Sequence, residues 1–378
     1  MKHRKTQLAA AVGAALLAGG TAVQAQTPPA VTSGQPLQIQ LYGQVNRAVM
    51  WADNETANKF FFVDGQPSST RFGIQGTAQI APGLRAGARI ESEMKSNPSN
   101  EVSFADPSQG AVTTAAGTDS VLFAERWLDA FFEGGWGRIN IGQGSGAADD
   151  ASTIDLSGTA IANGAAISDW AGGIPFTTAG GAAVGSATPA SVIDNLDFES
   201  RYDRVMYTTP TFGGFRAQVG TGQKSDTGEV NEASLWFSGK FAGDLQAAIG
   251  WSEEKTGGAG VKNNETVGGS VSWLSAAGFN VTAAYTQADL SVTPARKAKH
   301  WYGKVGYKFG AHAISFAYFQ GDDQNAADDE AKAYTVGYVW NPIRWAEIYA
   351  NYILYTLDRT GVDVNDITVA TIGTRIRF

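Results

Sequence analysis

Short strand-like runs, joined alternately by tight turns and by long connections, fill the chain from residue 37 to residue 378. The tight turns are rich in Gly, Pro and Asn, as at residues 81–83, and these residue types adopt the backbone angles that such turns need. A sheet that closes into a barrel across a membrane has tight turns on one side and long loops on the other. This arrangement therefore predicts a membrane-spanning β-barrel.

Apolar and polar side chains alternate within these runs. In residues 84–91, Leu84 and Ile90 fall on one face, whereas Arg85 and Arg89 fall on the other. A period of two residues indicates a strand with two different faces. The polar faces also carry Gly, Ser, Thr, Gln and Lys, which cannot fill a dry core, so they must face water or line a wet lumen.

About sixteen such runs can be placed, and an even number puts both chain ends on the same side of the membrane. They lie at residues 37–50, 70–80, 84–94, 121–133, 136–143, 201–209, 215–223, 231–241, 244–253, 265–274, 278–288, 299–309, 312–320, 332–340, 344–356 and 367–378. Pairing of the last run with the first would leave no open edge, as a lipid environment requires. The predicted fold class is all-β, a roughly sixteen-stranded antiparallel transmembrane β-barrel.

The longest connection, residues 144–200, is rich in Ala, Gly, Ser and Thr. It also carries more apolar side chains than a solvated loop needs. These are Ile154, Leu156, Ile161, Ile167, Trp170, Ile174 and Phe176. The interpretation that fits them is a long third loop folded into the pore, packed against the inner wall and forming a constriction. A disordered surface loop is the alternative.

The first 25 residues read as a secretory signal peptide. A basic start (Lys2, Arg4, Lys5) precedes a short apolar core and a small-x-small cleavage site before Gln26. The alternative is a short amphipathic N-terminal segment that is not cleaved. Cleavage would leave a barrel domain of residues 26–378, and it would remove these cations from a chain whose net charge is already −8. Such acidity argues against a nucleic-acid partner.

Charged side chains on the early strands and on the long loop predict a pore constriction. The polar faces of neighbouring strands carry Arg71, Arg85, Arg89 and Arg138. The long loop offers a set of carboxylates, namely Asp149, Asp150, Asp155, Asp169, Asp194 and Asp197. A positive wall opposite a negative loop would create a transverse field across the narrowest point. The alternative is that each arginine is an ordinary solvated residue of the lumen.

Two arginines break the alternation of their runs. Arg47 shares a face with Leu41 and Val45, and Arg126 shares one with Leu128. Both are expected near the outer rim, where headgroups or a β-bulge would accommodate them. Which way each side chain points is open.

An acidic segment in a later loop contains Asp322, Asp323, Asp328 and Asp329. Carboxylate oxygens suit the divalent cations that bridge lipopolysaccharide, so an external cation contact is one interpretation and a solvated loop is the other. Enzyme signals are poor, because neither His300 nor His312 stands in a metal-ligand pair or near a nucleophilic serine. No catalytic residue, metal centre or cofactor is predicted.

Several segments together resemble the Gram-negative general diffusion porins. Residues 68–76 (SSTRFGIQG) are similar to the second strand of that family, and residues 83–91 to the strand that follows. Residues 201–215 (RYDRVMYTTPTFGGF) are similar to the segment after the constriction loop, and residues 373–378 (GTRIRF) to the terminal strand. The resemblance implies a sixteen-stranded barrel, a homotrimer, a third loop in the pore and passive flux of small hydrophilic solutes.

Two departures from the family pattern affect the pore charge. Thr-Ala-Gln stands at residues 77–79, where the family often has acidic residues, and Gly-Gln-Gly stands at residues 142–144, where it often has an arginine facing the pore. The preference for cations or anions is therefore left open.

The expected function is passive diffusion of small hydrophilic solutes and ions through a water-filled pore in the cell outer membrane. The expected partners are outer-membrane lipid, lipopolysaccharide and two further copies of the chain, and the terminal Phe378 is the candidate assembly signal. A substrate-specific channel is the first alternative. A non-conducting barrel that acts as adhesin, receptor or enzyme is the second.

Overall fold

The computed structural model describes residues 37–107, 123–224, 228–255, 264–292 and 295–378. The predicted signal peptide lies outside the described residues and stays a prediction. No helix in these ranges is long and apolar enough to cross a membrane.

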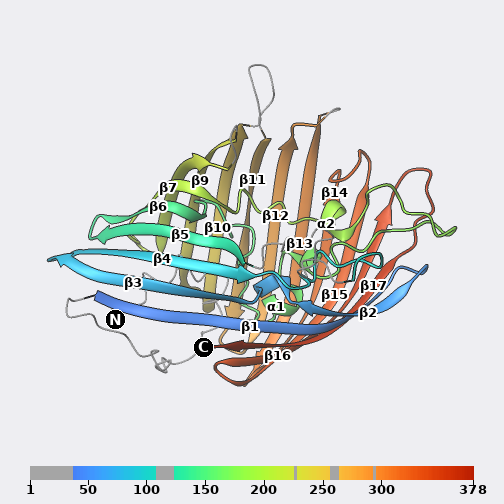
Figure 1. Ribbon diagram of the computed structural model, residues 1–378, viewed down its shortest axis with the longest axis horizontal. Coiled ribbons are helices and arrows are strands. Elements are labelled where there is room, and N and C mark those ends of the chain that lie inside the picture. Colours follow the sequence, from blue (N-terminus) through green and yellow to red (C-terminus); the bar gives the residue numbers. More distant parts are fainter. Residues whose placement is uncertain (1–36, 108–122, 225–227, 256–263, 293–294) are drawn as a thin grey trace, which may run out of the picture.

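The described residues form one antiparallel sheet of seventeen strand segments (Figure 1). The strands are β1 (Leu37–Asp53), β2 (Asn58–Asp64), β3 (Arg71–Ala81), β4 (Leu84–Met94), β5 (Phe123–Gly134), β6 (Gly137–Ser145), β7 (Arg201–Thr208), β8 (Phe215–Gln223), β9 (Glu229–Lys240), β10 (Gly243–Lys255), β11 (Asn264–Ser275), β12 (Phe279–Leu290), β13 (Arg296–Phe309), β14 (His312–Asp322), β15 (Glu330–Ile343), β16 (Ala346–Asp358) and β17 (Ile367–Arg377). The helical segments are η1 (Gln66–Ser68), α1 (Ala160–Asn163), η2 (Ile167–Asp169) and α2 (Pro189–Val192).

The sheet is closed, because β17 pairs with β1 from Gln44–Arg377 to Asp53–Thr368. On its other edge β1 pairs with two segments in succession, residues 37–44 with β3 and residues 47–53 with β2. β2 and β3 thus share one position in the wall and are separated by residues 65–70, which include η1. The seventeen segments therefore build the predicted sixteen-stranded barrel.

One sequence prediction is wrong at this point. Residues 51–69, the long connection predicted between the runs at 37–50 and 70–80, are not a long loop, since β1 continues to Asp53 and β2 follows after four residues. In β2 the exposed side chains of Phe60 and Phe62 alternate with the buried ones of Phe61 and Val63. A strand that is apolar on both faces carries no alternation of polarity, so the period-two test misses it.

The tight turns lie where the sequence predicts them, and two of them depend on glycine. Gly83, between β3 and β4, has φ +74°, and Gly278, between β11 and β12, has φ +94°. A side chain is disfavoured in this left-handed region, so glycine suits both positions.

Large apolar side chains are exposed on the outward faces of the strands, as lipid contact requires. Exposed aromatic rings gather at the tight-turn end of the barrel, where an interfacial girdle is expected. These rings are Trp136, Phe212, Phe241, Phe279, Phe309 and Trp345. Trp127 is not part of this girdle, because it faces inward and is only 7% exposed.

Candidate pore constriction

Residues 146–200 connect β6 to β7, and much of this loop is buried against the inward faces of the wall strands. The backbone N–H groups of Ile154 and Leu156 donate to the hydroxyls of Ser270 and Ser272 on β11, at 3.0 and 2.9 Å. Serine on the inward face thus replaces the water that these loop amides would otherwise bind. The start of the loop is thereby fixed to the sheet.

A buried ion pair anchors the loop to β13. Lys304 Nζ lies 2.6 Å from Asp155 Oδ2, and the two side chains are 0% and 2% exposed. The next turn of the loop is held by a contact of 2.6 Å between the Thr159 and Ser315 hydroxyls. Asp155 is a predicted constriction residue, but its charge is neutralised by Lys304, so it acts here as an anchor.

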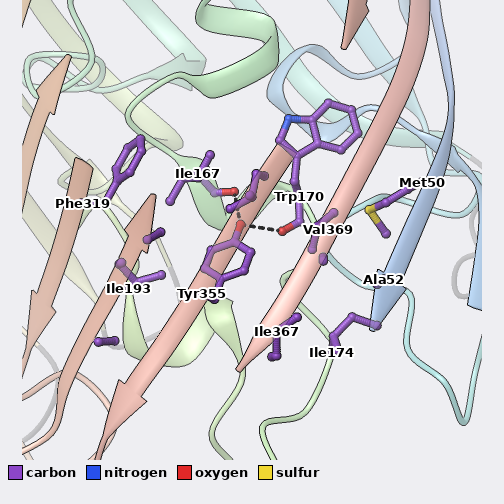
Figure 2. Packing of buried hydrophobic residues seen from close by; sticks show 14 of the residues in the cluster. Met50, Ala52, Ile167, Trp170, Ile174, Ile193, Phe319, Tyr355, Ile367 and Val369 are labelled. Atoms are coloured by element: carbon purple, nitrogen blue, oxygen red, sulfur yellow. Dashed lines mark hydrogen bonds between the residues drawn. The ribbon is translucent and has the colours of Figure 1, made fainter. Parts of the chain in front are cut away.

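The second half of the loop packs an apolar cluster against the inner faces of β1, β2 and β13–β17 (Figure 2). The Trp170 ring is fully buried, 5.8 Å from the ring of Tyr349. The Tyr355 hydroxyl lies 2.8 Å from the carbonyl oxygens of both Ile167 and Trp170. All the apolar loop residues singled out above are at most 6% exposed, namely Ile154, Leu156, Ile161, Ile167, Trp170, Ile174 and Phe176.

Glycines in the wall allow this close approach. A Cβ atom on Gly321 of β14 would lie 2.3 Å from the carbonyl oxygen of Val192, and one on Gly337 of β15 would lie 2.7 Å from Asn163. Both distances are shorter than van der Waals contact. At these two positions the loop therefore fits against the sheet only because the wall has no side chain there.

The predicted arginines lie on the inward faces of β3, β4 and β6, but most are paired. Arg89 Nη2 is 2.5 Å from Glu91 and its guanidinium lies 4.1 Å above the Trp127 ring. Arg138 is 3.5 Å from Glu133, and Arg85 is 3.8 Å from the same carboxylate. The basic wall is thus partly neutralised by its own carboxylates.

Arg126 points into the lumen because β5 contains a β-bulge. Glu91 of β4 pairs with Trp127 and Ser92 pairs with Glu125, which leaves Arg126 as the extra residue. Its guanidinium lies 2.9 Å from Glu91 and 2.8 Å from Glu93. The bulge resolves the broken alternation that the sequence shows.

Arg47 stays on the face that the alternation gives it, at the junction between β2 and the segment that follows. It donates to the carbonyl oxygen of Ser96 at 2.9 Å and lies 3.7 Å from Asp64. Arg47 thus binds a backbone oxygen of the segment that follows β4, and its Nη2 also donates to the carbonyl oxygen of Phe62 in β2 at 3.4 Å.

The sequence reasoning missed Arg375 of β17. Its Nη1 donates to Ser68 Oγ at 2.6 Å, and Arg71 Nη2 donates to the same oxygen at 3.0 Å. Arg71 also interacts electrostatically with Arg126, Arg201 and Arg375. The inward position of Arg375 could be predicted from the alternation in β17. Arg375 shares a face with Gly373, whereas Ile372 and Ile376 lie on the other, outward face.

A cavity of about 420 Å³ separates the loop carboxylates from this wall. Ser68 and Arg375 line it on the wall side. The loop lines it with Asp150, Asp155, Asp169, Asp194 and Asp197. A second, much smaller cavity is lined by Arg89, Arg138, Asp149 and Asp150, among others, so Asp150 borders both. Arg71 and Arg85 line neither cavity.

Burial raises the pKa of the loop carboxyl groups. Burial, and then the negative charge of Asp194, raise the pKa of Asp169 to about 7, although Arg126 opposes the shift. Burial and the neighbouring Asp150 likewise raise the pKa of Asp149 to about 7. The pKa of Asp197 is raised well above its usual value for the same reasons. The charge of the loop therefore changes near neutral pH.

The acidic external segment is largely occupied by internal contacts. Asp329 forms an ion pair with Arg359 at 2.5 Å, and Asp323 Oδ1 accepts from the backbone N–H of Asp328 at 2.8 Å. Gln320 donates to Asp322 at 2.8 Å. Cation binding by these residues stays a prediction.

The C-terminal residue takes part in barrel closure. The backbone N–H groups of Phe378 and Gly43 donate to each other's carbonyl oxygens, both at 3.0 Å. The ring is 62% exposed on the outer surface. Its role as an assembly signal stays a prediction.

Comparison with known proteins agrees with this architecture. Residues 9–359 match the sequence model of the Gram-negative porin family. The chain is 24% identical to outer membrane porin protein 32 of Delftia acidovorans, over 90% of this chain and 87% of that protein. It is also 24% identical to an outer membrane porin protein of Bordetella pertussis, over 88% of this chain and 80% of that one.

Solved structures show the same fold. An anion-selective porin from Comamonas acidovorans has a TM-score of 0.61 at 19% identity, covering 90% of this chain and all of that one. OmpF of Salmonella typhi, in complex with daunomycin, has a TM-score of 0.62 at 14% identity, covering 92% and 99%. With the closed barrel and the polar lumen, the family match shows that the chain belongs to the Gram-negative porins, the passive-diffusion channels of the outer membrane.

Proposed function

We propose that small hydrophilic solutes and ions cross this barrel between the long loop and the wall that carries Ser68 and Arg375. The observation that carries the proposal is the uneven filling of the lumen. The apolar cluster around Trp170 closes the side next to β13–β17, whereas the cavity of about 420 Å³ lies beside η1 and is lined by charged groups. Only the second region offers a hydrated path.

The proposed constriction has carboxylates on one side and guanidinium groups on the other. Asp150, Asp169 and Asp197 belong to the loop, whereas Arg375 belongs to the wall, where it forms an ion pair with Glu347 of β16. Arg126 of β5 also interacts electrostatically with Asp169. Opposed charges in a narrow passage with low-dielectric walls orient polar solutes and disfavour apolar ones, because apolar solutes displace ordered water.

Planar-bilayer recording tests this function. The purified protein should conduct in steps, with conductance that follows the size and charge of the ions and no saturable block by one solute. Saturable block would favour the substrate-specific channel. Absence of any conductance steps would overturn the pore proposal and favour a binding or receptor role. The passage itself requires no catalytic residue.

The ion preference should depend on pH. Asp169 has a pKa of about 7, and a carboxyl group is neutral below its pKa, so acidification removes negative charge from the loop. The reversal potential in a salt gradient should therefore shift towards anions between about pH 8 and about pH 6, a window that spans this raised pKa. Asp169→Asn should reduce that shift; an unchanged shift would remove Asp169 from the passage.

We also propose that the protein forms a homotrimer in outer-membrane lipid that contains lipopolysaccharide. One similar solved structure, OmpT of Vibrio cholerae, is described in a trimer form, with a TM-score of 0.56 at 15% identity. Exposed apolar residues on β1, β3 and β17, such as Leu41, Ile74 and Ile372, would suit either lipid or a neighbouring copy. Mass measurement of the detergent-solubilised protein should give three chains, and a monomer would exclude the trimer.

A further inference from the structure

Three carboxylates meet where the long loop leaves and rejoins the wall. Asp149 and Asp150 stand near its start and Asp197 near its end, and one ligand oxygen of each lies within 4.8 Å of the other two. No other group of three or more such side chains in the described ranges comes together in this way. Spacing of this kind suits coordination of one cation by oxygen atoms.

A second observation points to a missing positive partner. The Asp149 side chain belongs to a residue that is only 9% exposed, and its Oδ2 atom has no hydrogen-bond partner among the described residues. A buried carboxylate oxygen without a donor is unfavourable, and an unfilled ion site is one recognised reason for it. Arg201 acts on Asp149 electrostatically but forms no ion pair with it in the described part of the chain.

The other two carboxylates are held in place by the loop itself. Asp197 accepts from the Ser152 hydroxyl at 2.7 Å and from the backbone N–H of Asp150 at 3.2 Å. The Thr153 hydroxyl lies 3.3 Å from Asp150 Oδ1. A carboxylate oxygen that accepts one of these hydrogen bonds has a second lone pair, so it can coordinate a cation at the same time.

We propose that Asp149, Asp150 and Asp197 bind a hard divalent cation, with Ca²⁺ favoured over Mg²⁺. Ca²⁺ accepts irregular sets of carboxylate, hydroxyl and water oxygens, whereas Mg²⁺ demands a near-ideal octahedron. Since Asp150 lines both cavities, the ion sits beside the proposed path and joins the two ends of the loop. Its effect on ion flow rests on the proposed function, but its binding does not.

Calorimetric titration with CaCl₂ tests the binding. The full chain is refolded in detergent, so that no lipopolysaccharide contributes sites, and is freed of metal with a chelator. We expect one Ca²⁺ per chain with a Kd of about 0.1–1 mM, in the range of extracellular calcium modules. Asp197→Asn and Asp149→Asn should each weaken binding at least about tenfold, as loss of a charged ligand implies.

Asp169→Asn is the matched control, because it removes a carboxylate from the same loop and the same cavity but not from the triad. It should bind Ca²⁺ as the wild type does. Absence of Ca²⁺ binding by the wild type, or equal weakening in the control, would overturn the proposal. MgCl₂ in place of CaCl₂ should bind more weakly, and tighter binding of Mg²⁺ would overturn the order given above.

A recording in bilayers separates this inference from the pore proposal. Adding Ca²⁺ should shift the reversal potential of the wild type towards anions, because the ion cancels loop charge, and should leave Asp197→Asn nearly unchanged. Ca²⁺ binding without conductance would support the proposed cation site and contradict the pore proposal. Conductance without Ca²⁺ binding would support the pore proposal and contradict the proposed cation site.

Discussion

Lys304→Met is expected to destabilise the folded protein by about 3–5 kcal/mol, the usual cost of removing one partner of a buried ion pair. Lys304 and Asp155 are almost fully buried and lie 2.6 Å apart, so the substitution leaves the Asp155 charge without its cation. The Ser157 backbone N–H, 2.8 Å from Asp155 Oδ1, compensates only in part. The start of the loop should detach from β13, which a lower denaturation midpoint in detergent and a larger single-channel conductance would report.

Lys308→Met is the matched control for this prediction. Lys308 lies on the same inward face of β13, nearer the tight turn, and no ion pair to Asp155 involves it. It removes the same charge from the lumen but should leave the midpoint almost unchanged. The double variant Lys304→Met with Asp155→Leu should recover much of the lost stability, since no charge is then left buried. Equal losses in both single variants would show that the ion pair does not hold the loop.

Trp170→Ala is expected to cost about 3–5 kcal/mol, as large-to-small changes of buried aromatic residues do. The Trp170 ring is fully buried between the loop and the wall, next to Tyr349. Because the barrel closes through backbone pairing that does not involve the loop, the loss should fall on the loop and spare the sheet. Limited proteolysis should then cut within residues 146–200, and the conductance should rise.

Trp345→Ala provides the comparison for Trp170→Ala. Trp345 is 54% exposed at the outer tight-turn rim and belongs to the girdle, so its removal creates no internal cavity. It should leave the protease resistance of the loop and the conductance unchanged. If both variants conduct like the wild type, the apolar cluster does not set the width of the passage.

Much of the barrel was predictable from the sequence because each strand separates two solvents. A strand with lipid on one face and water on the other must alternate, and β4 shows this with outward Ile90 and inward Arg89. The burial of the loop was also predictable, since exposure of the large apolar side chains of Trp170 and Phe176 to water is unfavourable. The sequence did not predict β2, because both faces of this strand are apolar and no alternation is visible.

The candidate site was predictable in its residue types but not in its pairings. Arg89 and Arg126 both reach Glu91, although the alternation puts Arg126 on the outside. Only the extra residue of a β-bulge turns it inward, and a bulge depends on how two strands pair. Likewise Asp155 reads like the other loop carboxylates until the fold brings Lys304 next to it.

The sequence by itself therefore determined the closed barrel, its two surfaces and the presence of a loop that must be buried. Those properties follow from local periodicity and from the transfer of apolar groups out of water, which act within a few residues. Only the tertiary structure decided which carboxylates pair with a lysine or arginine and where the cavity lies. It also decided that Asp149 and Asp197 meet at the base of the loop. Contacts between residues far apart in the chain depend on the path that the loop takes through the lumen, and no local pattern encodes that path.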